Sequence, residues 1–337
     1  MHERFPARAA ATRPSFPVRT AAIAAALVVP LVPAAAQEAE PRAPGQLEVD
    51  PEAAERALER TLTAEGALLL PVGRVEIEPS LRYERTERDE FVGIDVDGDG
   101  AIGLGEVGPA DIERDEVEAG LDIRVGLPFR TQFELGVPYR FVSSDETANL
   151  LGSRQTESNS GSGIGDVTVG LAATLLREEG WRPDVIARAT WDTATAKETE
   201  GNLLLAESFH EIRGSLTFLK RQDPLAFVGS VFYETAFERD DIDPGDSYGF
   251  GLSANLAASP ETSLSLGFQQ SFSQDLERDG RSIDNSDTTQ GVLTLGASSI
   301  LGDGVLLNVT LGVGLSDDAP DYFVRVGLPI RLGRALF

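Results

Sequence analysis

The sequence predicts an all-β fold: a transmembrane, antiparallel, up-and-down β-barrel of about twelve strands, preceded by a short N-terminal helix. Three observations lead to this prediction. Apolar and polar residues alternate with a period of two in twelve segments after residue 70, and the connections between these segments are alternately short and long. No segment after residue 36 is apolar enough for a membrane helix, so a membrane location requires a closed barrel, which satisfies every backbone polar group in lipid.

The composition restricts the class of protein further. The chain has 337 residues, a formal net charge of −26 and no cysteine. So acidic a chain has no basic stripe that neutralises phosphates, and we therefore expect no nucleic-acid partner. The lack of cysteine excludes a disulfide-stapled fold but is compatible with the periplasm or outer membrane.

Residues 1–36 are typical of a secretory signal peptide. A basic segment precedes a short apolar run, Ala21–Val32, and the small residues Ala34–Ala36 then provide a cleavage site. The alternative, a transmembrane anchor, is disfavoured because the apolar run is shorter than the ~20 residues that span a bilayer. We expect the mature chain to begin near Gln37.

Residues 37–70 are predicted to form a periplasmic linker with one short helix. Asp50 followed by Pro51 is a helix start signal, and Glu52 to Leu62 place Ala54 and Leu58 on one face with Leu62. A helix of this length is marginal in isolation. The sequence leaves two placements open: the helix docks on the barrel or enters its lumen, or it is only a periplasmic lead-in.

The barrel itself is predicted over residues 71–337. In its first strand Val75, Ile77, Leu81 and Tyr83 alternate with polar residues, which gives one apolar face and one wet face. The same pattern recurs near 117–125, 133–141, 164–176, 184–193, 208–219, 225–238, 247–259, 263–273, 288–300, 305–316 and 322–332. Each segment is close to the ~9–11 residues that a tilted membrane strand needs.

The connections support a barrel over a soluble β-sandwich, which is the main rival fold. Long gaps at 86–114, 143–163, 194–207, 239–246 and 274–287 alternate with short turns such as Pro128–Arg130. Outer-membrane barrels have short periplasmic turns and longer extracellular loops, and an even strand count places both termini in the periplasm. Charged residues within the strands also argue against the apolar core of a sandwich.

Fifteen charged residues are predicted to face the barrel interior. They have two interpretations, which the sequence leaves open: a pore lining that sets ion preference, or a ladder of arginine–carboxylate pairs that fills and stiffens a narrow lumen. The residues are Glu76, Glu78, Arg82, Glu84, Glu118, Asp122, Arg124, Glu134, Arg140, Asp166, Asp184, Arg188, Asp192, Glu211 and Arg213.

The first long connection contains a calcium-binding motif. Residues 95–106 match the EF-hand loop D-x-[DN]-x-[DN]-G-x5-E, in which Gly100 allows the sharp turn. The expected Ca²⁺ ligands are the side chains of Asp95, Asp97, Asp99 and Glu106 and the backbone carbonyl of Ala101. The helix that precedes an ordinary EF-hand loop is absent, and Ala110–Glu116 is expected to form a short helical turn after it. The alternative is an acidic, glycine-rich surface loop.

The sequence gives little support for an enzyme. His210 is the only histidine of the expected mature chain, and its parity places it on the outer face with Ile212 and Phe218. No Ser/His/Asp arrangement can be placed from the spacing. We therefore expect no catalytic residues and no organic cofactor.

Three stretches resemble a known family: Ala67–Pro71 with the Val75–Tyr83 strand, Gly161–Val167, and the turn Arg182–Asp184. Over roughly residues 67–337 the chain is similar to the outer-membrane β-barrels labelled MetA-pathway of phenol degradation. The resemblance implies a transporter of aromatic compounds and implies no catalytic residues. Barrels that export functional amyloid share the plan of a helix before twelve strands, although their helix is longer.

The sequence therefore predicts an outer-membrane channel or transporter for small or hydrophobic solutes, with a calcium-binding extracellular loop. The alternative is a structural or export barrel that carries no small solute. The expected partners are outer-membrane lipid and a small solute, and the expected assembly is a monomer or a trimer.

Overall fold

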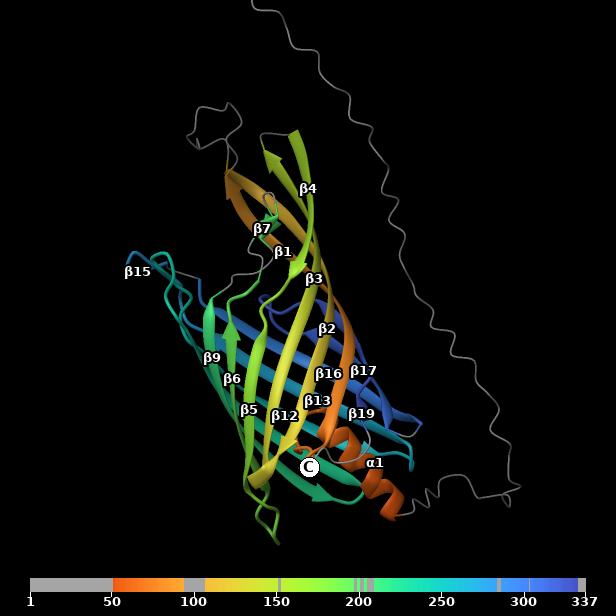
Figure 1. The fold of residues 1–337 in the computed structure, drawn as a ribbon. Coiled ribbons are helices and arrows are strands. Elements are labelled where there is room, and N and C mark those ends of the chain that lie inside the picture. Colours follow the sequence, from red (N-terminus) through yellow and green to blue (C-terminus); the bar gives the residue numbers. More distant parts are fainter. Residues whose placement is uncertain are drawn as a thin grey trace, which may run out of the picture. The chain divides into compact units, whose positions relative to one another are not determined.

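The computed structural model describes residues 51–93, 107–150, 153–196, 199–200, 203–204, 209–283, 286–302 and 304–332. The expected signal peptide lies outside this range. Within it, no helix is both long enough and apolar enough to cross a membrane. The described chain forms a closed antiparallel barrel with one α-helix, α1 (Pro51–Ala64), as the sequence predicted (Figure 1).

The barrel wall is built from fourteen strand segments. They are β1 (Val75–Gly93), β2 (Val107–Leu127), β3 (Thr131–Leu150), β4 (Ser153–Ile164), β5 (Thr168–Leu176), β6 (Asp184–Thr193), β9 (His210–Gln222), β10 (Leu225–Ala236), β12 (Ser247–Ala257), β13 (Thr262–Ser273), β16 (Thr288–Gly302), β17 (Val305–Gly314), β18 (Tyr322–Gly327) and β19 (Ile330–Leu332). Short strands β7 (Thr199–Glu200), β8 (Leu203–Leu204), β11 (Ile242–Asp243), β14 (Glu277–Arg278) and β15 (Arg281–Ser282) lie in the connections, and a 3-10 turn, η1 (Pro128–Arg130), joins β2 to β3.

These segments make twelve strands that span the barrel wall, and we call each such strand a stave. The segments β4 and β5 pair with successive parts of β3, and β18 and β19 pair with successive parts of β1, so each pair of segments forms one stave. Every stave pairs antiparallel with the next along the chain, and pairing of the last stave with β1 closes the barrel. The predicted count of twelve strands is therefore confirmed.

Two predicted loops are much shorter than expected. The strand pair β1–β2 continues to Gly93 and Val107, and β3–β4 continues to Leu150 and Ser153. Residues 86–93, 107–114, 143–150 and 153–163 are therefore strand, and Ala110–Glu116 is not helical. The sequence pattern missed them because these segments are polar on both faces. Figure 1 shows β1–β4 extending beyond the neighbouring strands, at the end that we call the hairpin end.

The opposite end carries the short turns, and α1 lies there (Figure 1). We call it the short-turn end. The helix begins at Pro51, as predicted, and runs to Ala64, two residues past the predicted end. Leu58 and Leu62 are fully buried against Leu219, Ala226 and Ala257 of the barrel wall. Of the two placements that the sequence left open, the structure shows the helix docked inside the barrel.

The two faces of the wall differ as the alternation predicts. The outer face exposes large apolar side chains, among them Leu121, Leu252, Leu266 and Leu295, which are 41–60% exposed. Their neighbours in sequence point inward and are charged or small. An exposed apolar belt around a closed barrel is the surface that lipid covers, whereas a soluble protein would bury it.

Candidate functional site

The lumen is the candidate site, and one half of its wall is charged. Glu76 and Glu78 on β1 are almost fully buried, and both form ion pairs with Arg124 of β2; the contact between Arg124 Nη1 and Glu76 Oε1 measures 3.1 Å. On β6, Arg188 Nε lies 2.9 Å from Glu134 Oε2 of β3. Opposite charges thus pair between adjacent strands (β1 and β2) and across an intervening strand (β3 and β6, with β5 between them), which is the ladder that one of the two interpretations predicted.

The ladder includes residues that the sequence reasoning missed. Arg331 Nε donates to Glu76 Oε2 at 2.8 Å, and Arg325 Nη2 lies 3.3 Å from Glu78 Oε1. Glu116 joins Glu118 in pairing with Arg140. The sequence alternation could have revealed Arg325 and Arg331, because both alternate with the outward-facing apolar residues of the last stave and therefore face the lumen.

The other half of the wall carries small polar side chains. The inward positions of β12, β13 and β16 include Ser247, Gly249, Gly251, Ser253, Asn255, Ser263, Ser265, Gly267, Gln269, Ser271, Ser273, Thr288, Gln290, Thr294, Gly296 and Ser298, with Ala257 and Val292 as apolar members of the same face. Such residues do not fill a barrel of twelve strands. The charged half and the small half together give the lumen a polar lining in place of a packed apolar core.

Two aromatic rings also face the lumen, each between an arginine and a glycine. The guanidinium of Arg213 stacks 3.7 Å from the ring centroid of Phe232, and that of Arg82 stacks 3.9 Å from Phe323. Phe232 lies against Gly249, and Phe323 lies against Gly312 in the same way. Each ring is thereby held flat against the wall, and each cation is held beside it.

The C-terminal end of α1 is fastened to the charged half of the wall. Arg124 Nη1 donates to the carbonyls of Thr63 and Ala64 at 3.0 and 2.9 Å, which satisfies helix carbonyls that have no partner within the helix. Arg188 Nη2 donates to the carbonyl of Gly66 at 3.0 Å. The same arginines therefore serve the ladder and the helix, which holds α1 across the short-turn end of the lumen.

Gly66 makes this attachment sterically feasible. Its φ of +76° is the left-handed conformation that ends many helices, and the amides of Ala67 and Leu68 both donate to the carbonyl of Leu62. A Cβ at position 66 would lie 3.0 Å from Nη2 of Arg188. Past this turn, the amide of Leu70 donates to Gln132 Oε1 at 2.8 Å and anchors the segment leading to β1.

Glu65 enters a small cavity of about 80 Å³ above the end of α1, together with Glu78 and Arg325. Water in the lumen reaches the Glu65 side chain, yet protein atoms enclose it on most sides. This enclosure raises the pKa of Glu65 to about 7, against the opposing effect of a hydrogen bond from Asn255. With its amide nitrogen turned toward Glu65, Asn255 lies 3.2 Å from both carboxylate oxygens.

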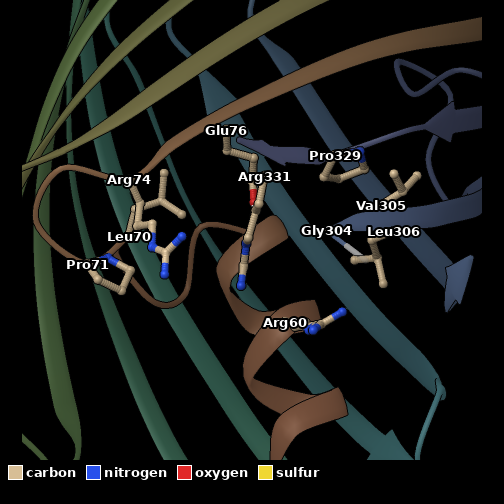
Figure 2. A pocket seen from close by; sticks show the side chains of 10 residues that line it. All are labelled: Arg60, Leu70, Pro71, Arg74, Glu76, Gly304, Val305, Leu306, Pro329 and Arg331. Atoms are coloured by element: carbon tan, nitrogen blue, oxygen red, sulfur yellow. The ribbon is translucent and has the colours of Figure 1, made fainter. Parts of the chain in front are cut away.

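A second, larger cavity of about 490 Å³ opens beside α1 at the short-turn end. Figure 2 shows the residues that line it, which come from α1, the segment before β1, β1 itself, and the β17 and β19 region. They are Arg60, Leu70, Pro71, Arg74, Glu76, Gly304, Val305, Leu306, Pro329 and Arg331. The cavity combines three guanidinium groups with an apolar wall.

The remaining predicted site residues can be placed as follows. The calcium ligands Asp95, Asp97, Asp99, Ala101 and Glu106 lie outside the described residues. Within the described ranges, no group of three or more His, Cys, Asp or Glu residues could hold a metal ion. His210 is exposed beside Trp191, with ring centroids 5.9 Å apart, in agreement with its predicted outward orientation.

The fold resembles solved outer-membrane barrels. The COG4313 outer membrane channel from Pseudomonas putida F1 matches with a TM-score of 0.59 and 17% identity over 79% of this chain and 97% of that chain. The translocator domain of the autotransporter NalP from Neisseria meningitidis matches with a TM-score of 0.47 and 11% identity, over 84% and 98% of the two chains. The toluene transporter TbuX from Ralstonia pickettii matches with a TM-score of 0.41 and 9% identity, over 78% and 90%.

A family profile matches the chain over residues 116–332, which comprise nearly two thirds of its length and most of the barrel. Its description is "Putative MetA-pathway of phenol degradation". The match agrees with the resemblance carried by the Gly161–Val167 and Arg182–Asp184 segments. The chain belongs to this family of barrels.

Proposed function

We propose that this protein is an outer-membrane channel or transporter for small or hydrophobic solutes. One observation carries the proposal: most inward positions of β12, β13 and β16 are small or polar, and side chains of this size do not fill the interior of a twelve-stranded barrel. A barrel with a purely structural role has no need of an open, polar interior. The closed barrel and its likeness to the COG4313 channel support an outer-membrane location, with α1 at the periplasmic mouth.

In this function α1 acts as a plug that limits passage. The helix packs Leu58 and Leu62 against the wall at the short-turn end, and Arg124 and Arg188 hold its C-terminal end in place. A solute crosses only if this helix shifts or if space beside it suffices. The lumen residues then provide a polar path for a small solute.

The test is conductance of the purified protein in planar bilayers. Wild-type protein is expected to give small or infrequent single-channel steps, because the docked helix narrows the lumen. Leu62→Asp, which places a charge in the buried helix interface, is expected to give larger, steady steps. Glu59→Gln is the matched control, since Glu59 is exposed on the same helix. A folded Leu62→Asp barrel that carries no current would favour the structural or export role.

We also propose that residues 95–106 bind one calcium ion through Asp95, Asp97, Asp99, Glu106 and the carbonyl of Ala101. The motif is the first support. A second is that Gly93 pairs with Val107, so the hairpin brings the two ends of this segment together. An EF-hand loop needs that closure, because its first and twelfth positions share one ion. Without flanking helices we expect a dissociation constant on the order of 10⁻⁴–10⁻³ M, as in extracellular modules.

Calorimetry with CaCl₂ on the purified protein tests this site. Wild type is expected to bind one Ca²⁺ ion and to become more resistant to proteolysis within residues 94–106. Asp95→Ala and Glu106→Gln are expected to lose both effects, because each removes a ligand. Equal heats and equal cleavage in wild type and variants would identify the segment as an acidic surface loop without calcium.

A further inference from the structure

We propose that the 490 Å³ cavity beside α1 binds an organic anion: a carboxylate head on a compact apolar body. This inference rests on the proposed transport function, because it names a class of solute that the barrel would admit. It depends on a convergence that the chain order does not reveal. Arg60, Arg74 and Arg331 come from α1, the segment before β1, and β19, and all three line one cavity (Figure 2).

The charges around the cavity favour an anion. Three arginines line it, and among the described lining residues Glu76 is the one carboxylate. Both oxygens of Glu76 already face a guanidinium group: Oε2 accepts a hydrogen bond from Arg331, and Oε1 lies 3.1 Å from Arg124 Nη1 in an ion pair without a hydrogen bond. Among the residues whose side chains the structure describes, none forms an ion pair with Arg60, which is partly exposed to the cavity. In a chain with a net charge of −26, such a local excess of positive charge is unusual.

The apolar lining favours a carboxylate that carries a hydrocarbon body over a bare inorganic ion. Leu70, Leu306 and Pro329 are buried residues that line the cavity, Leu70 on one side and Leu306 and Pro329 on the other (Figure 2). A cavity of this size falls in the range of small-molecule sites, which are mostly apolar with a few convergent polar groups. Guanidinium groups match the planar geometry of a carboxylate and can bind it through two parallel hydrogen bonds.

The position also suits a transport path. The cavity adjoins the plug helix and borders the charged half of the lumen through Glu76 and Arg331. Its lining includes Arg60 of the helix and Arg331 of the wall, so an anion bound there lies between α1 and the charged half of the lumen. The cavity is therefore placed as a binding site on the transport path, at the short-turn end of the barrel.

Benzoate is a suitable probe, with benzyl alcohol as its neutral counterpart and inorganic phosphate as an anion without an apolar body. Binding to the full mature protein in detergent is measured by calorimetry, with protein-free micelles as the blank. Wild type is expected to bind benzoate at least about tenfold more tightly than benzyl alcohol, since a hydrogen bond to a charged group contributes that much. It is also expected to bind benzoate more tightly than phosphate, because only benzoate buries an apolar ring against the apolar lining. Arg60→Gln and Arg74→Gln are each expected to weaken benzoate binding about tenfold.

Arg130→Gln is the matched control, because Arg130 is an exposed arginine at the same end of the barrel but outside the cavity. It should bind benzoate as wild type does. Equal benzoate affinity in wild type, Arg60→Gln and Arg130→Gln would overturn the proposal, and so would phosphate binding as tight as that of benzoate. Conductance in planar bilayers is recorded separately. Benzoate binding that depends on Arg60, in a barrel that carries no current, would support the binding site and refute the transport function. A current in a barrel that does not bind benzoate through Arg60 would support the transport function and refute the binding site.

Discussion

Replacing Leu62 by alanine is expected to release α1 from the lumen while leaving the barrel folded. Leu62 is fully buried against Leu58 and the wall residues Leu219, Ala226 and Ala257, so the substitution removes apolar contacts and leaves a cavity. Leucine-to-alanine changes at such sites cost about 2–5 kcal/mol. The barrel strands lose no hydrogen bond, and the cost therefore falls on docking of the helix. At about 1.4 kcal/mol per factor of ten, docking should weaken roughly thirtyfold or more.

The chain has no cysteine, so a single Thr63→Cys substitution provides a clean reporter. Thr63 is 5% exposed at the docked end of the helix, and its thiol would react with a water-soluble maleimide only when the helix leaves the wall. Labelling of Thr63→Cys should accelerate at least about thirtyfold when Leu62→Ala is added. Glu59→Gln should leave the rate unchanged. Equal rates with and without Leu62→Ala would refute a helix held by this apolar contact.

Three further predictions follow from the same structure. Leu135→Arg should impair folding far more than Glu134→Ala, because arginine on the lipid face near the midplane costs ~2–4 kcal/mol; equal refolding yields would show that the assigned faces are wrong. Gly66→Ala should raise the Thr63→Cys labelling rate, since it strains a positive φ and crowds Arg188; an unchanged rate would count against that turn. Docking of the helix raises the pKa of Glu65 from 4.5 to about 7, so the docked state favours the protonated carboxyl. The contribution of Glu65 to docking is therefore complete below pH 4.5 and is lost as the pH rises through 7. The labelling rate of Thr63→Cys, divided by the rate of the same variant carrying Glu65→Gln, should therefore be lower at pH 5 than at pH 8. Solvent in the lumen reduces the size of this effect. Parallel pH profiles for the two variants would argue against a role of Glu65 in docking.

The location of the protein is the last prediction. The mature chain is expected to fractionate with the outer membrane and to run anomalously on gels unless boiled, because closed membrane barrels resist unfolding by detergent. The exposed apolar belt that includes Leu252 and Leu266 requires a lipid or detergent cover. Recovery of the protein in the soluble periplasmic fraction would contradict the membrane assignment.

The sequence by itself determined the barrel, the number of staves and the sidedness of each strand. These properties follow from a local rule: side chains in a strand alternate between faces, so Val75, Ile77 and Leu81 define the lipid side and Glu76 and Glu78 the lumen. The rule fails where both faces are wet. Segments such as Ser153–Gly161 have no apolar alternation, and the sequence therefore suggested loops where the structure has paired strands.

Only the tertiary structure decided where the helix lies and which charges meet. The apolar stripe with Leu58 and Leu62 fits a lead-in helix as well as a plug, because a periodicity shows that a face is buried but not what buries it. The convergence of Arg60, Arg74 and Arg331 depends on closure of the barrel, which brings β19 beside β1. Contacts between residues more than two hundred positions apart leave no local pattern, and a single sequence therefore cannot reveal them.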